Sequence, residues 1–216
     1  MTSKKYILLI LGSILLSVGT VQAATHYIPE DLQKEQKQLE QKLIATQNAE
    51  TYFELAMSYA YTGWVEVAWD QLKKVPEYDE NYADIVIAKY SKKIKEEPEN
   101  WKHYFKMAFG YYFKGNKDMT LLLFIKAHAA EPKQPWIIGF MSLLEGENKN
   151  YDKAIELAKK AIAIEPNGTA LHFLLAQAYS ETGNFFGALG EGAHVIRLKS
   201  SEAKYRPVPP SFDEKK

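Results

Sequence analysis

The chain has 216 residues, 27 basic and 27 acidic side chains, and an apolar fraction of 46%. This length and composition are those of one folded domain, and the balanced charge excludes a general electrostatic attraction to nucleic acid. Because the sequence contains no cysteine, it excludes a disulfide framework, a thiolate metal site and a catalytic cysteine.

The first 23 residues have the pattern of a secretory signal peptide. Two lysines precede an apolar run over residues 6–18, and Val21 and Ala23 occupy the two positions that a signal peptidase reads. We therefore expect a signal peptide over residues 1–23, cleaved after Ala23. The alternative is an uncleaved anchor, but the run is shorter than the roughly 20 residues that span a bilayer.

Export sets the expected location of the chain. In a bacterium the mature protein would lie in the periplasm, and an extracellular or N-terminally anchored protein is the alternative. No later apolar run approaches membrane length, so we expect no stable membrane span after signal cleavage.

Residues 24–48 are predicted to form an N-terminal helical segment. Pro29 and the acids that follow it are typical of a helix start, and Leu32, Leu39 and Leu43 recur on one side of the helix. The remaining face is polar.

A period of thirty-four residues follows in the second half of the chain, where Glu-Pro pairs recur at Pro98, Pro132 and Pro166. A fixed period of this length is typical of a solenoid of stacked helix hairpins. Within the period that starts at Trp101, apolar residues recur at helical spacing over residues 101–114 and again over 117–130. Each period therefore predicts two antiparallel helices.

These rows resemble tetratricopeptide repeats. The motif residues of the row 101–134 are Tyr104, Met107, Ala108, Tyr111, Gly115, Phe124, Ala127 and Pro132. Thr120 departs from the usual alanine. The next row has Glu145 and Lys149 in place of tyrosine and glycine, and the last has Gly192 in place of a large residue and Ser200 in place of proline.

The resemblance implies an all-α, right-handed α-solenoid of antiparallel helix hairpins. About four units are expected, over residues 49–82, 101–134, 135–168 and 169–200. Residues 83–100 are surplus to the period and predict one additional helix. This helix either caps a break in the solenoid or is the surviving half of a degraded repeat.

The resemblance also implies a function, because the first helices of such units line a concave groove that binds a protein or peptide. The apolar residues expected there are Phe53, Met57, Tyr61, Phe105, Phe109, Tyr112, Phe113, Phe140, Leu143 and Phe173. Lys102 and Lys106 are expected to engage acidic groups of the partner. The alternative is that half of these side chains pack against neighbouring helices.

The sequence carries no pattern typical of an enzyme. Its five histidines lack the spacing of a metal site, and it has no nucleophile or phosphate-binding motif. We expect no catalytic residue, metal or cofactor. The charged runs mix both signs, which is typical of solvated helix faces and not of a nucleic-acid site.

The C-terminal segment, residues 201–216, is proline-rich and is predicted to be a flexible tail. The alternative is that it occupies the groove of its own or a neighbouring molecule. Together these features predict an exported protein–protein interaction module or assembly scaffold. A self-associating scaffold of an envelope or membrane-associated assembly is the alternative function.

Overall fold

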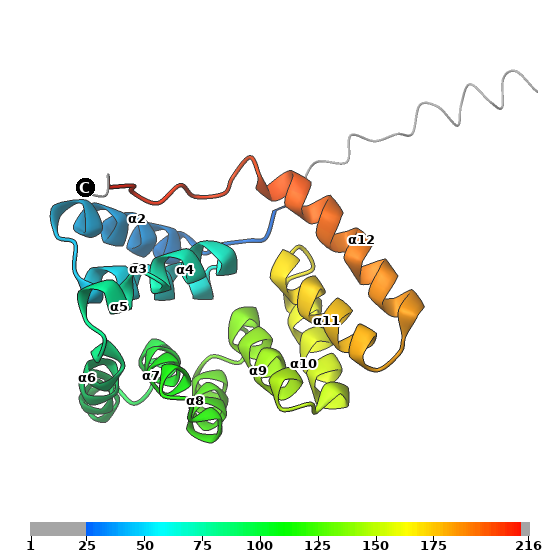
Figure 1. The fold of residues 1–216 in the computed structure, drawn as a ribbon, viewed down its shortest axis with the longest axis horizontal. Coiled ribbons are helices and arrows are strands. Elements are labelled where there is room, and N and C mark those ends of the chain that lie inside the picture. The colour runs from blue at the N-terminus through cyan, green and yellow to red at the C-terminus, as the bar shows by residue number, and fades with distance from the viewer. Residues whose placement is uncertain (1–24, 213–216) are drawn as a thin grey trace, which may run out of the picture.

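The computed structural model describes residues 25–212, and the expected signal peptide lies outside them. All regular structure in this range is helical (Figure 1). The helices are α2 (Glu30–Ala45), α3 (Ala49–Tyr61), α4 (Val65–Leu72), α5 (Val75–Tyr78), α6 (Tyr82–Glu96), α7 (Trp101–Phe113), α8 (Lys117–Ala130), α9 (Pro135–Glu147), α10 (Tyr151–Ile164), α11 (Thr169–Glu181) and α12 (Phe185–Glu202). Consecutive helices pack as hairpins, which confirms the predicted all-α hairpin array.

Three hairpins follow the thirty-four-residue period: α7 with α8, α9 with α10, and α11 with α12. In two of these hairpins, the asparagine side chain before the second helix caps a free backbone donor. Asn116 accepts a hydrogen bond from the Met119 amide at 3.1 Å, and Asn184 accepts one from the Gly187 amide at 3.0 Å. Lys149, which stands where the repeat has glycine, adopts the same positive φ as Gly115 and Gly183.

The array curves until its two ends approach each other. Figure 1 shows residues 203–212 running from the end of α12 to α2, and the N-terminal segment before α2 passing beside α12. Phe212 packs against the main hydrophobic core. The tail expected to be flexible therefore lies against the molecule as far as residue 212. No helix between residues 25 and 212 combines the length and the hydropathy needed to cross a membrane.

Helix α3 lies at the centre of the core. All of its residues except Glu50 are buried. Tyr59 donates a hydrogen bond to Glu40 of α2 at 2.8 Å, and the Tyr61 ring lies edge-on to Phe105 of α7 with 5.7 Å between centroids. α3 is therefore enclosed both by a helix that precedes it in the sequence, α2, and by one that follows it, α7.

Helix α6, the surplus helix of the sequence, packs on α7 and reaches α3 with its side chains. The rings of Tyr82 and Phe53 lie 5.7 Å apart, and Lys89 Nζ donates to Glu54 at 2.8 Å. Helix α4, in contrast, has only eight residues and ends shortly before Pro76. α6 therefore contacts both α3 and α7.

A buried acidic side chain anchors this junction. Glu54 accepts hydrogen bonds from Lys106 Nζ at 2.6 Å, from Lys89 and from the Tyr90 hydroxyl. Burial by itself raises the pKa of Glu54, but the charge and hydrogen bonds of Lys106, followed by Lys89 and Tyr90, outweigh it and lower the pKa to about 2. The carboxylate thus stays ionised inside the protein.

The turn between α3 and α4 docks on the start of α9, seventy-three residues further along the chain. Gln134 Nε2 donates to the Tyr61 carbonyl at 3.1 Å. Gly63 has φ of 91°, and a Cβ atom built on it would lie 2.2 Å from Trp136 Cζ2. Only glycine satisfies both the left-handed conformation and this close approach.

We predict that Gly63→Ala destabilises the fold by about 3 kcal/mol, because left-handed strain is added to overpacking against Trp136. Gly183→Ala is the matched control, since Gly183 has φ of 75° but open space around its Cα, and it should cost about 1 kcal/mol from strain alone. Chemical denaturation of both variants measures the difference. Equal losses would show that the turn does not touch Trp136.

We predict that the free energy of unfolding falls as the pH drops from about 5 towards 2. The folded pKa of Glu54 lies below its unfolded value, so its contribution is present above the unfolded pKa and is lost as pH falls through the folded pKa. Glu54→Gln should reduce this loss by about 2 kcal/mol, because the amide has no charge to titrate. Urea denaturation at several pH values checks the slope, and identical slopes for both proteins would contradict the ion-pair assignment.

Candidate functional site

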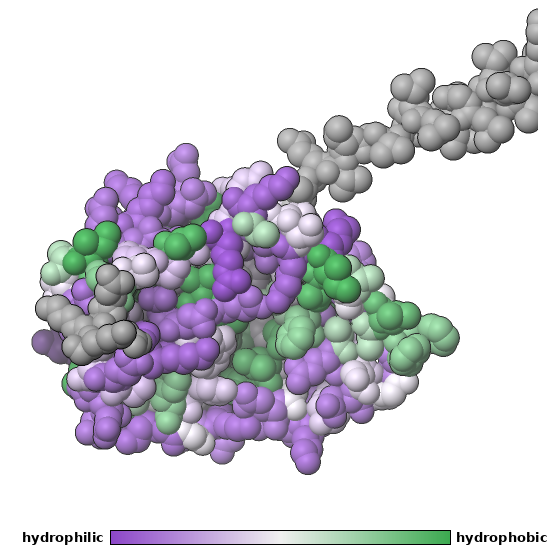
Figure 2. Space-filling model, turned by 45° about the horizontal axis from the view of Figure 1, so that its top comes forward, coloured by the Kyte–Doolittle hydropathy of each residue, from purple (hydrophilic) through white to green (hydrophobic). Residues whose placement is uncertain are grey.

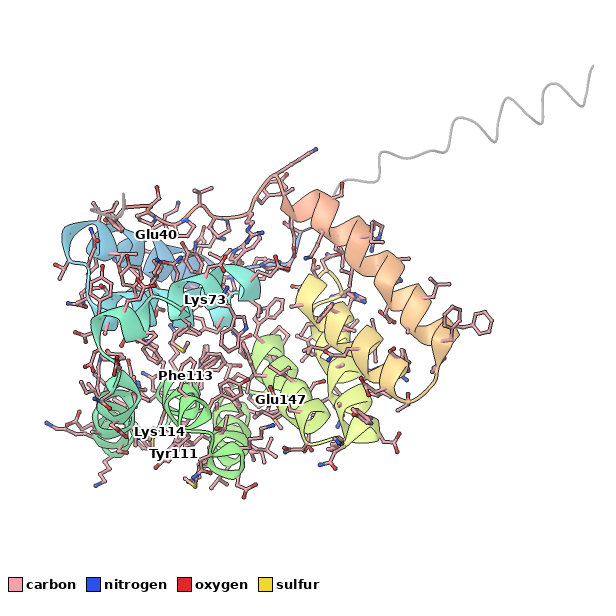
Figure 3. The ribbon with its side chains drawn as sticks, in the orientation of Figure 1. Glu40, Lys73, Tyr111, Phe113, Lys114 and Glu147 are labelled. Atoms are coloured by element: carbon pink, nitrogen blue, oxygen red, sulfur yellow. The ribbon has the colours of Figure 1, made fainter. Side chains whose placement is uncertain are left out.

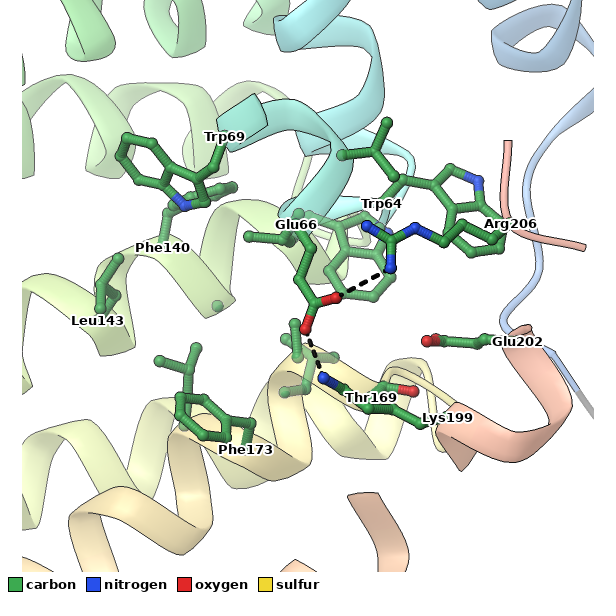
Figure 4. A pocket seen from close by; sticks show the side chains of 18 residues that line it. Trp64, Glu66, Trp69, Phe140, Leu143, Thr169, Phe173, Lys199, Glu202 and Arg206 are labelled. Carbon is green, nitrogen blue, oxygen red and sulfur yellow. Dashed lines mark hydrogen bonds and ion pairs between the residues drawn. The ribbon is translucent and has the colours of Figure 1, made fainter. Parts of the chain in front are cut away.

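A cavity of about 300 Å³ opens where the ends of the array meet, between α4, α9, α11 and the last turns of α12 (Figure 4). Its walls are mainly apolar and aromatic. The largest wall side chains are Trp64, Trp69, Trp136, Phe140, Leu143 and Phe173. Figure 2 shows hydrophobic residues in the middle of this face, between hydrophilic side chains. We call this cavity the central pocket.

Charged side chains close one side of the central pocket. Glu66 of α4 accepts hydrogen bonds from Lys199 at 2.5 Å and from Arg206 at 3.3 Å, as the dashed lines of Figure 4 mark. These side chains are about half exposed, so each pair contributes no more than about 1 kcal/mol. The pairs therefore contribute little to holding α12 and the tail against α4.

The N-terminal segment before α2 packs against two of the tryptophans that line the central pocket. The His26 ring packs edge-on against Trp64 and Trp136, with centroid distances of 4.7 and 5.4 Å, and its side chain is fully buried. The Tyr27 amide donates to Glu165 at 2.9 Å. Glu165 belongs to one of the Glu-Pro pairs that mark the repeat period. The start of the described chain is therefore hydrogen-bonded to the turn after α10.

The structure buries much of the predicted groove. Phe53, Met57, Tyr61, Phe105 and Phe109 each have 2% or less of their surface exposed. These residues form part of the core, so the expectation that they line an open groove is wrong for this conformation. Their burial matches the alternative that about half of the set packs against neighbouring helices.

The cause is the position of the first hairpin. Trp69 of α4 lies over α7, with ring centroids 6.3 Å from Phe109, 6.1 Å from Tyr112 and 6.4 Å from Phe113. Figure 3 shows Phe113 on the side of α7 nearest α4, whereas Tyr111 points away from it. The chain's own α4 therefore covers the side of α7 that the sequence assigned to a partner.

The two predicted lysines are also engaged within the molecule. Lys106 is buried and paired with Glu54, and Lys102 forms an ion pair with Glu35 of α2. Neither ammonium group is free for an acidic partner, because each already faces a carboxylate. Tyr112, half-buried, donates to Glu147 at 2.9 Å.

Three predicted residues do line the central pocket, namely Phe140, Leu143 and Phe173. The sequence reasoning missed the three tryptophans beside them, Trp64, Trp69 and Trp136. These tryptophans do not belong to the repeat motif. A large aromatic side chain without a place in the motif must pack outside the regular contacts between repeats, and this property could have indicated them. Across residues 25–212 no cluster of histidine and acidic side chains could hold a metal ion.

Comparison with known proteins supports the fold. The tetratricopeptide repeat family model matches residues 147–190, from the end of α9 through α10 and α11 into α12. The MamA RS-1 ArsTM double mutant superposes with a TM-score of 0.50 over 80% of this chain and 88% of its own, at 15% sequence identity. The fold is tetratricopeptide-like.

Another crystal structure of MamA covers 83% of this chain and 99% of its own at 19% identity, with a TM-score of 0.49. No curated protein matches the sequence at a significant level. The family match and the superposition describe the repeat and the fold of the chain.

Proposed function

We propose that the chain is an exported interaction scaffold that binds a partner protein by taking an apolar segment of it into the central pocket. The observation that carries this proposal is the pocket itself. It is a concave, largely apolar site in a tetratricopeptide-like array in which α4 covers one side of α7. Sites of this shape and composition are the usual binding sites of folded proteins.

The pocket dimensions define the chemistry of the partner. A cavity of about 300 Å³ has the volume of about ten water molecules, which suits one or two bulky apolar side chains and not a whole helix. Trp69 and Phe173 offer ring faces and edges for an aromatic or branched residue. The rim charges balance one another, so the partner is selected by its apolar side chains and not by its net charge.

Export is supported by the sequence alone. The pattern of residues 1–23 is that of a secretory signal, and the mature chain without cysteine needs no oxidising compartment to fold. Periplasmic residence is the location we propose if the source is bacterial.

We predict that peptides selected from a random phage-displayed library on residues 24–216 carry bulky apolar residues and bind the central pocket. Phe173 is 57% exposed at the pocket wall, so Phe173→Glu should leave the fold intact. It should weaken the binding of these peptides at least about tenfold, which is a loss of about 1.4 kcal/mol of binding free energy. Isothermal titration calorimetry of the synthesised peptides measures the effect.

Ile125→Glu is the control, because Ile125 is a comparably exposed apolar residue on α8, outside the pocket. It should leave peptide affinity unchanged. Peptides that bind Phe173→Glu as tightly as the unchanged chain, or that are affected equally by both substitutions, would contradict the pocket as the site.

A further inference from the structure

The last helix of the array presents an uncovered apolar face. Phe185, Phe186, Leu189 and Ile196 of α12 are 68%, 84%, 62% and 75% exposed. Helices α8 and α10 hold the equivalent place in their hairpins, but each packs on the first helix of the next unit. Figure 2 shows hydrophobic residues gathered at the end of the molecule that α12 forms.

Seven of the exposed residues of α12 form one stripe along the helix. Positions 186, 189, 190, 193, 196, 197 and 200 are exposed and follow a spacing of three and four residues. Leu198, the one buried residue of α12, lies on the opposite side and faces the array. The stripe is therefore a continuous helix face and not a set of scattered side chains.

Large and small residues alternate within the stripe. Phe186, Leu189 and Ile196 project from it, whereas Gly190 and Ala193 leave space between them. A Cβ atom added to Gly190 or to the adjacent Gly192 would meet nothing within 4 Å. Another helix can thus approach closely along the middle of this face and receive projecting side chains on either side.

We propose that a second copy of this chain covers the face, through an antiparallel pairing of the two α12 helices about a twofold axis near Ala193. This surface is separate from the central pocket, and the inference does not rest on the partner proposed above. Antiparallel pairing about position 193 places Ile196 of one copy opposite Gly190 of the other, so a projecting residue meets a gap on each side of the axis.

Charge and area agree with a second copy as the occupant. Arg197 is the one charged residue of the stripe, and its two copies would lie about 12 Å apart along the axis, since eight residues at 1.5 Å each separate them. The exposed apolar side chains amount to about 500 Å² per molecule, so a dimer would bury about 1,000 Å², near the lower limit of specific interfaces. The dimer should therefore form at micromolar concentration and dissociate on dilution.

Sedimentation equilibrium of residues 24–216 over a range of concentrations tests the proposal. The unchanged chain should show a monomer–dimer equilibrium. Leu189→Lys with Ile196→Lys should weaken it at least about a hundredfold, because position 189 faces Arg197 of the other copy and a lysine there adds like-charge repulsion. Ile125→Lys, which places the same charge on an exposed position of α8, should dimerise normally. A chain that stays monomeric to about 100 μM, or a dimer that persists in the double variant, would overturn the proposal. Binding of the monomer to lipid vesicles or to another protein instead would also overturn it.

The absence of native cysteine allows a direct test of the arrangement. Ala193→Cys should form an intermolecular disulfide readily under mild oxidation, because the axis brings the two copies of this position together. Leu122→Cys, on the exposed surface of α8, should not. Equal cross-linking of the two variants would rule out the antiparallel pairing about Ala193.

Discussion

Almost every side chain of helix α3 is buried, and the surrounding helices enclose it. Burying one large apolar side chain contributes about 2 kcal/mol, and α3 buries Phe53, Leu55, Met57, Tyr59 and Tyr61 within three turns. α2 covers it from one side, α6 and α7 from another, and the start of α9 contacts the turn that follows it. Several of the polar groups that this burial traps have partners: Glu54 meets two lysines, and the Tyr59 and Tyr61 hydroxyls donate to carboxylates of α2.

Enclosing α3 determines what remains available to a partner. The first hairpin occupies the inner side of the array, where Trp69 meets the aromatic side chains of α7. The central pocket lies at the place where α4, α9, α11 and the end of α12 meet. Among residues 25–212 no further hairpin packs on α12, and the outer face of this helix is uncovered.

The period of the sequence was sufficient to predict the helix hairpins, because the spacing of apolar residues and the capping turns act locally. Trp101, Pro135 and Thr169 do begin helices, and residues 82–96 do form one additional helix. The groove could not be predicted in the same way. Whether Phe105 or Phe109 is exposed depends on where α4 lies, and α4 is positioned by Gly63 and Trp136, which are seventy-three residues apart. Contacts over such separations leave no periodic trace, so only Phe140, Leu143 and Phe173 of the predicted groove reach the pocket.

The central claim is that the first hairpin is an integral part of the array and not a detachable first unit. Native-state hydrogen exchange of the amides of α3 tests this most directly. Amides from Phe53 to Tyr61 should exchange only through global unfolding, with protection equal to the highest found in α7 and α9. Exchange of these amides through a local opening, faster than that of α7 and α9, would show that the hairpin leaves the groove and would contradict the account.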